Sequence, residues 1–210
     1  QHNPVATVKK TVSRKLKGHR SLSRAEIMRI WNTGQLTPPM LLALKMLLAT
    51  GQRVEEVLHA TWGEFDANQS VWIIPGERRK TRGKNVEPHI IPLTALHLQL
   101  LSEIKAETAH SRFLFPATGG KAPRRYDTLT NAVRKFVNAS DMDSFSPRDI
   151  RRTFKTVTGS MGISLELRNR LQGHALTDTG SVYYDRYDYL AEKRAAMETW
   201  TTGLVEIVEG

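Results

Sequence analysis

The segment at residues 37–51, Thr-Pro-Pro-Met-Leu-Leu-Ala-Leu-Lys-Met-Leu-Leu-Ala-Thr-Gly, constrains the fold more than any other part of the chain. Its apolar side chains fall on nearly every side of a helix, and only Lys45 interrupts them. A helix of this kind has to be covered by other elements, so it belongs in the core. Pro38 suits the first turn of this helix, and Gly51 suits its end. The apolar run is too short to cross a membrane.

The rest of the chain predicts shorter helices and one region with the composition of strands. Further helices are expected after a capping box formed by Ser23 and Glu26, and at about residues 53–60, 95–104, 126–139, 147–159, 164–172 and 190–200. β-Branched and aromatic residues predict antiparallel strands near residues 62–65, 70–75 and 89–93. Residues 204–208 are expected to form a strand on that sheet, in the same subunit or in a neighbour. The fold class is α+β, mainly α-helical with a small antiparallel β-sheet.

The charge of the chain indicates a polyanionic partner. The 31 lysine and arginine residues outnumber the 21 aspartate and glutamate residues, which gives a net charge of +10. The basic residues gather in local clusters, at residues 78–84, 124–125 and 148–155. This pattern favours nucleic acid, although a merely basic domain would carry the same charge. The absence of cysteine excludes a disulfide framework and a cysteine-ligated metal, and it fits a reducing cytoplasm.

Three segments carry residues with the character of phosphate ligands. Arg53 begins a helix, and Glu56, one turn later, can orient it. Arg148 and Arg151 share a helix face, and guanidinium groups bind phosphate oxygens through paired hydrogen bonds. His174 directly follows the end of a helix, where it can donate to an oxygen or transfer a proton. Each position, taken alone, also fits an ordinary surface residue, and for Arg53 and His174 this is the simpler explanation.

A cluster of tyrosines supplies a candidate nucleophile. Four of the five tyrosines of the chain lie within residues 183–189. A tyrosine hydroxyl can form a covalent intermediate with phosphorus. Two arginines, a histidine and a lysine can stabilise the charge of a five-coordinate phosphorus without a metal. Aromatic packing of a C-terminal helix is the alternative explanation of the cluster.

Five local strings, taken in order, resemble the tyrosine recombinase (phage integrase) family, and most closely the integrases of prophages and genomic islands. They are Thr-Gly-Gln-Arg-Val-Glu-Glu-Val-Leu at 50–58, Lys80-Thr81 followed by His-Ile-Ile-Pro-Leu at 89–93, Asp-Ile-Arg-Arg-Thr-Phe at 149–154, Leu-Gln-Gly-His at 171–174, and Tyr-Asp-Arg-Tyr-Asp-Tyr-Leu at 184–190. Each string is weak evidence alone, but five in this order are specific. The resemblance spans about residues 20–200 and implies an integrase-type catalytic domain, with the DNA breaking-rejoining fold.

The resemblance implies how the matched cationic residues act. Arg53 and Arg151 would clamp the scissile phosphate, and His174 would bind a non-bridging oxygen or assist proton transfer. Family members usually carry histidine three residues before the second arginine, where this chain has Arg148. Arginine can donate to phosphate but cannot act as a general base near neutral pH, so Arg148 is expected to bind phosphate.

The resemblance also implies a general acid and a nucleophile, with no metal or cofactor. Lys80 would protonate the leaving 5′-oxygen, and Lys84 is the second candidate for this role. Tyr184 would attack the phosphorus and form a 3′-phosphotyrosyl link. Tyr183 is the second candidate, and only one of the two can face the phosphate because adjacent helical positions point about 100° apart.

The same resemblance implies the partners and the organisation of the chain. Double-stranded DNA at the core of an attachment site would be the substrate, bound by a homotetramer, with accessory DNA-bending or excision factors. No membrane association is expected, and the protein would be cytoplasmic in a bacterium and associated with the nucleoid. Residues 1–20, which are polar and basic, would link an N-terminal DNA-binding region to the catalytic domain at 21–210, whose tail begins at about residue 201.

Two other functions remain open at this point. A catalytically inactive relative that only binds DNA would explain the charge, but not the ordered strings. A type IB topoisomerase would use similar chemistry, but the string at residues 184–190 is typical of integrases. Covalent capture of DNA, and relaxation of a plasmid that lacks a specific site, would separate the three.

Overall fold

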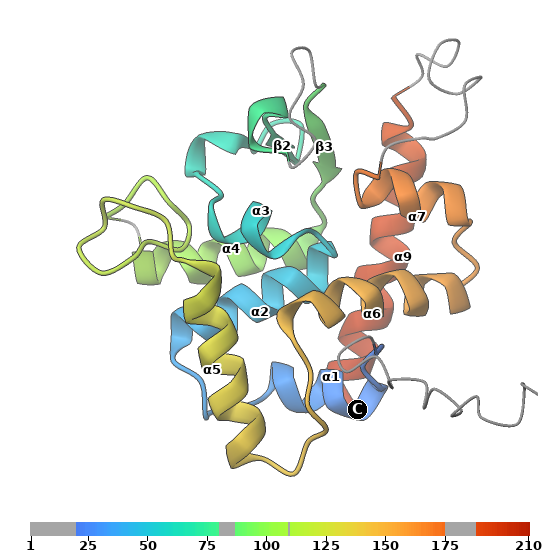
Figure 1. The fold of residues 1–210 in the computed structure, drawn as a ribbon. Coiled ribbons are helices and arrows are strands. Elements are labelled where there is room, and N and C mark those ends of the chain that lie inside the picture. The colour runs from blue at the N-terminus through green and yellow to red at the C-terminus, as the bar shows by residue number, and fades with distance from the viewer. Residues whose placement is uncertain (1–19, 80–86, 109, 175–187) are drawn as a thin grey trace, which may run out of the picture.

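The computed structural model describes residues 20–79, 87–108, 110–174 and 188–210. Helix α2 (Pro38–Thr50) lies at the centre of the fold (Figure 1), and most of its side chains are buried. It begins with proline and ends at Gly51, which has the left-handed conformation with φ of +63°. Its neighbours are α1 (Arg24–Trp31), α3 (Val54–Leu58), α4 (Ala95–Thr108), α6 (Pro147–Ser160) and α9 (Leu190–Glu209). The central position predicted from its apolar surface is therefore confirmed.

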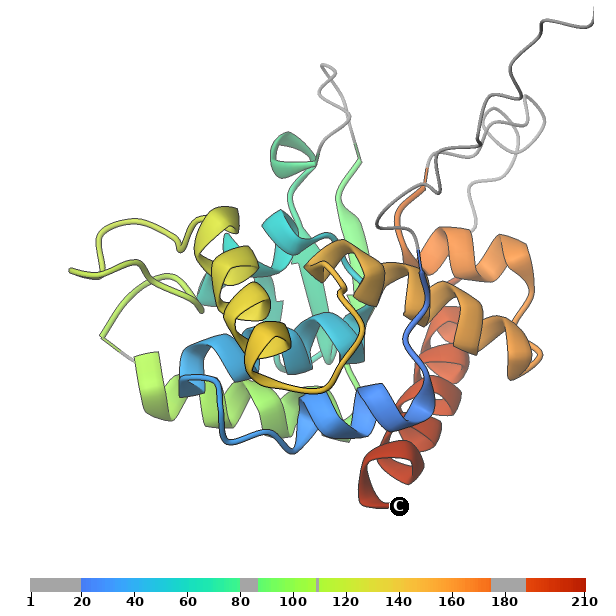
Figure 2. The same cartoon turned by 60° about the horizontal axis from the view of Figure 1, so that its bottom comes forward.

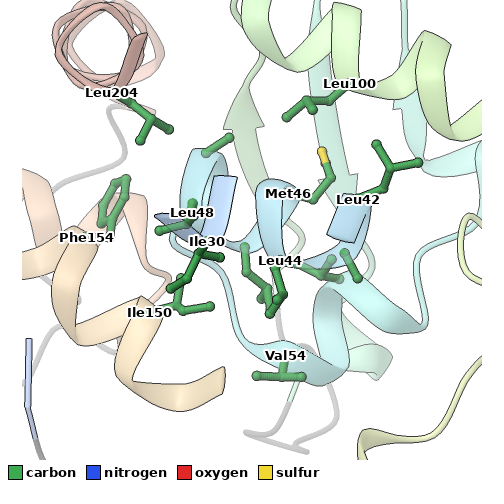
Figure 3. Close-up of a cluster of buried hydrophobic side chains, with 14 of the residues drawn as sticks. Ile30, Leu42, Leu44, Met46, Leu48, Val54, Leu100, Ile150, Phe154 and Leu204 are labelled. Carbon is green, nitrogen blue, oxygen red and sulfur yellow. The ribbon is translucent and has the colours of Figure 1, made fainter. Parts of the chain in front are cut away.

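The hydrophobic core surrounds α2 and joins helices that are distant in the sequence. Figure 3 shows side chains of α2 together with Ile30 from α1, Leu100 from α4, Ile150 and Phe154 from α6, and Leu204 from α9. The Phe154 ring also meets the Trp200 ring edge to face, with centroids 5.3 Å apart. Burying each such side chain contributes about 1.5–3 kcal/mol to stability. This packing fixes the first turn of α6 relative to the end of α2, where the candidate arginines lie.

A three-stranded antiparallel sheet follows α3, as predicted. It has the order β1 (Phe65–Asp66), β2 (Val71–Ile74), β3 (His89–Pro92), and Trp72 is paired with Ile91. The first strand is shorter than expected because Trp62–Glu64 forms a turn of 3₁₀ helix before it. Glu64 is buried in this turn and accepts hydrogen bonds from the Trp72 indole (3.0 Å) and from Arg78 (2.6 Å). These bonds fasten the sheet to the turn.

The expectation of a strand at residues 204–208 is wrong, because α9 continues without a break to Glu209. Leu204, Ile207 and Val208 are buried, and their spacing is that of one helix face. This face packs against α1 in the same chain, and Asn32 donates to the Val208 carbonyl (2.9 Å). Figure 2 shows the C-terminal end of α9 beside α1. Five alternating residues fit either period, and in the helix the apolar side chains meet the core.

The remaining helices agree with the predicted ones. Helices α5 (Tyr126–Ala139) and α7 (Leu165–Leu171) complete the described fold, and the predicted capping box at the start of α1 is present. Within the described ranges, the structure contains no helix whose length and hydropathy would let it span a membrane. Helices α3, α5, α6 and α7, whose places in the fold Figure 1 shows, carry or adjoin the residues that form the site.

Candidate active site

Arg53 lies immediately before α3 and is held by a buried carboxylate, as the sequence predicted. The Glu56 side chain is only 3% exposed and accepts hydrogen bonds from the Arg53 backbone amide (2.9 Å) and guanidinium (2.7 Å). The turn at Gly51 lies two residues before Arg53 and leads the chain into α3. Gly51 packs directly against the Phe154 ring, so the turn is held close to α6. One guanidinium nitrogen of Arg53 is therefore fixed by the protein, and its remaining donors are available to a ligand.

Helix α6 carries Arg148 and Arg151 in its first turns. A capping box formed by Ser146 and the fully buried Asp149 fixes the start of this helix. Arg151 donates to the Gly51 carbonyl (3.0 Å) and to the Gln172 carbonyl. Burial lowers the pKa of Arg151 to about 10, and the nearby positive charge of Arg53 adds to this effect. The guanidinium of Arg151 is thus charged at neutral pH, and an anion beside it would relieve its desolvation.

Side chains from three distant segments hold the end of α7, directly before His174. The carbonyl groups of residues 171–173 accept hydrogen bonds from Gln52 (2.8 Å), Arg151 (2.5 Å) and Arg79 (2.8 Å), respectively. The amide of His174 is bound to the Asn169 carbonyl (3.0 Å). The position of the imidazole relative to the arginines is therefore set by the backbone on which it stands.

The histidine itself lies in a strongly positive environment. Burial, together with the positive charges of Arg151, Lys155 and Arg53, lowers the pKa of His174 to about 4. The ring is consequently neutral near pH 7, with one nitrogen that donates and one that accepts. A neutral imidazole can bind an anionic oxygen through its N–H or accept a proton through its other nitrogen.

The four described candidates, Arg53, Arg148, Arg151 and His174, line a single pocket of about 360 Å³. Its other lining residues include Tyr126, Arg152, Lys155 and Gln172. Glu55 is the only acidic residue among the described residues that line it. A concave site with several guanidinium groups and few carboxylates is suited to a phosphate group. In the described ranges, no group of three or more histidine or acidic side chains could hold a metal ion.

Several residues of the site were not predicted from the sequence. Lys155 follows Arg151 by one helical turn and donates to the Asn169 side chain (2.8 Å), so helical spacing alone could have indicated it. Gln172 is buried, and its amide donates to carbonyl groups of Gly51 and Arg151 across more than twenty residues of sequence. No local pattern indicates such contacts, and the same holds for Tyr126.

The other candidates lie outside the described residues. These are Lys80 and Lys84, proposed as general acid, and Tyr184 and Tyr183, proposed as nucleophile. Arg79, which precedes Lys80 in the sequence, donates both to the Gly173 carbonyl (2.8 Å) and to the Glu87 carbonyl (3.1 Å).

The chain is similar to known integrases in sequence. The model of the Phage integrase family matches residues 20–189. The integrase of Enterobacteria phage P4 is 24% identical over 169 residues, which cover 76% of this chain and 38% of that protein. The chain thus spans well under half the length of this relative. Prophage integrase IntA of Escherichia coli K12 is 27% identical over 154 residues, with 73% of this chain and 36% of that protein covered.

Solved structures agree on the fold. The integrase from mycobacterium phage Brujita superposes with a TM-score of 0.66 at 14% identity, covering 90% of this chain and 63% of that one. XerH site-specific recombinase, bound to its difH substrate, superposes with a TM-score of 0.60 at 20% identity, covering 84% of this chain and 52% of that one. Because the family model matches most of the sequence and the fold agrees, this chain belongs to the phage integrase family.

Proposed function

We propose that this domain cuts and rejoins DNA at specific sites, as the catalytic domain of a tyrosine recombinase. The observation that carries the proposal is the convergence of Arg53, Arg148, Arg151 and His174, from three separate segments, on one pocket. Membership of the phage integrase family and the names of its relatives, which are integrases and Xer recombinases, support the same function. The Tn1549 transposon integrase, whose structure is similar and is a complex with circular intermediate DNA, supports DNA as the substrate.

In this proposal the described residues bind the scissile phosphate and stabilise its transition state. Arg53 and Arg151 donate to its non-bridging oxygens, and each is already oriented by the hydrogen bonds that the protein makes to it. Arg148 adds a further donor in place of the usual histidine. Fixed donors of this kind stabilise the charge that develops at phosphorus without reorganisation during the reaction.

The covalent steps are assigned to residues outside the described ranges. The Tyr184 hydroxyl oxygen attacks the phosphorus, the bond from phosphorus to the 5′-oxygen breaks, and Lys80 protonates that oxygen. The proton that the tyrosine loses passes to His174, whose pKa rises when the negative charge of the phosphate lies beside it. In the second step the 5′-hydroxyl oxygen of a partner duplex attacks the phosphorus of the phosphotyrosine and gives its proton to Lys80. The bond from phosphorus to the tyrosine oxygen breaks, and His174 returns a proton to that oxygen. Each step exchanges one phosphate ester for another, so the reaction consumes no ATP. The guanidinium groups stabilise the charge at phosphorus in the way that a metal ion otherwise would.

The proposed assembly extends beyond this domain. We expect a homotetramer on two duplexes, accessory DNA-bending or excision factors, and a location at the bacterial nucleoid. The net charge of +10 supports close association with DNA. Residues 1–20 would connect residues 21–210 to an N-terminal DNA-binding region, and the activity belongs to the full-length protein.

Covalent capture tests this function. The full-length protein is incubated in EDTA with a nicked duplex that carries the core of its attachment site, and adducts that resist detergent are separated. We expect an adduct with wild type and a loss of about 10²-fold or more with Arg151→Ala. Binding without any adduct would favour an inactive DNA-binding relative. Rapid relaxation of a plasmid that lacks the site would favour a type IB topoisomerase.

A further inference from the structure

Among the described residues, Arg148 has fewer hydrogen bonds to the rest of the protein than the other two arginines of the site, Arg53 and Arg151. It stands at the second position of α6, next to the buried Asp149, and its side chain is exposed at the pocket. Within the part of the chain that the structure describes, no carboxylate pairs with it and no group accepts a hydrogen bond from it. Arg53 and Arg151, by contrast, each have fixed acceptors.

Tyr126 makes a cation–π contact with this guanidinium. The centre of the Arg148 guanidinium lies 5.1 Å from the centroid of the Tyr126 ring, a distance typical of a cation–π interaction. Tyr126 is the first residue of α5, and its ring is half-buried against the hydrophobic core. Helix α5 packs in turn against α3 and α6, so the ring is a fixed surface (Figures 1 and 2).

We propose that Tyr126 is a positioning residue, whose ring face holds Arg148 over the scissile phosphate. The inference rests on the proposed function, because that function assigns a phosphate to the pocket. An unrestrained arginine loses much of its side-chain freedom when it binds, and stacking on a fixed ring removes part of this loss in advance. The ring face carries the effect, and the hydroxyl is not needed for it.

The contact between Arg148 and the Tyr126 ring can be tested by NMR, without DNA cleavage. Aromatic ring currents shift the NMR signals of the Arg148 side chain, and these signals are recorded for wild type, Tyr126→Phe and Tyr126→Leu. We expect the shift to persist in Tyr126→Phe and to disappear in Tyr126→Leu. Signals of Arg148 that are the same in all three proteins would overturn the inference, whatever the enzyme does with DNA.

The effect on the reaction is tested by a double-mutant cycle. Rates of covalent adduct formation are measured at saturating DNA for wild type, Tyr126→Leu, Arg148→Ala and the double variant. Loss of a cation–π contact at an exposed site predicts a slowing of about 2- to 5-fold for Tyr126→Leu. Arg148→Ala is expected to slow the reaction by about 10²-fold. Tyr126→Leu should then add nothing in the Arg148→Ala background, because its effect acts only through that arginine.

Two further variants complete the design. Tyr126→Phe should retain most of the wild-type rate, and Thr128→Ala, an exposed substitution in the same turn of α5, should leave it unchanged. Equal slowing by Tyr126→Leu with and without Arg148 would overturn the inference, and so would a defect in Tyr126→Phe as large as that in Tyr126→Leu. A wild-type protein that forms no adduct would overturn the proposed function instead, and the NMR comparison would still decide whether the ring holds Arg148.

Discussion

The substitution Gly51→Ala is expected both to destabilise the domain and to displace Arg151 in the pocket. Gly51 has φ of +63°, and a β-carbon added there would clash with the Phe154 ring, which is fully buried. The left-handed conformation costs a residue with a β-carbon about 1–2 kcal/mol, and overpacking a core costs about 1–3 kcal/mol. We therefore expect the free energy of unfolding to fall by about 2–5 kcal/mol. The Gly51 carbonyl accepts a hydrogen bond from Arg151 (3.0 Å), so adduct formation should slow as well.

Urea unfolding measures this loss, and two other glycines separate its causes. Gly162 has φ of +84° but open space around its α-carbon, so Gly162→Ala should cost only the backbone term of about 1–2 kcal/mol. Gly63 has neither feature, and Gly63→Ala should change stability by less than about 0.5 kcal/mol. A Gly51→Ala protein no less stable than Gly162→Ala would refute the close packing of the turn against Phe154.

Three further predictions concern single side chains. Glu56→Gln removes the negative charge that holds Arg53 but keeps the shape of the side chain. The rate of adduct formation at saturating DNA should then fall about 10-fold, which corresponds to the loss of one charge-assisted hydrogen bond. An unchanged rate would contradict the orienting role of Glu56. Burial lowers the pKa of His97 to about 4, below the value of about 6.5 in the unfolded chain, so its contribution to stability is complete above pH 6.5 and is lost as the pH falls towards 4. Urea unfolding should show a loss of up to about 3 kcal/mol from this group, and His97→Gln should flatten that dependence; an unaltered slope would count against it. Lys155→Ala should reduce the slope of log affinity against log salt concentration by about 1 if the lysine contacts a phosphate, and an unchanged slope in a filter-binding titration would exclude the contact.

The sequence correctly predicted those elements whose apolar pattern fits only one kind of secondary structure. Helix α2 is apolar on nearly all sides, so its place in the core followed directly. The tail at residues 204–208 was misassigned because a short alternating run fits both periods, and only the surface of α1 decides between them. The 3₁₀ turn at Trp62–Glu64 begins with a capping box between Thr61 and Glu64, a spacing that is visible in the sequence. The bonds from Trp72 and Arg78 to the same carboxylate join it to other segments and are not.

The sequence predicted which residues belong to the site but not how they come together. Arg53, Arg148, Arg151 and His174 were found because short strings around them, taken in order, resemble those of the family. Their convergence on one pocket depends on contacts between segments about a hundred residues apart, such as that of Arg151 with the Gly51 carbonyl. Such contacts are products of packing and appear only in three dimensions.

Identification of the modified tyrosine tests the central claim most directly. The DNA adduct of the full-length protein, formed in EDTA on its attachment-site core, is digested and mapped by mass spectrometry. We predict a phosphotyrosyl link at Tyr184, lost in Tyr184→Phe and retained in Tyr183→Phe. A link at Tyr183 would preserve the chemistry and move the nucleophile by one residue. A full-length protein that binds this DNA but forms no tyrosine adduct would contradict the assignment of the domain as a tyrosine recombinase.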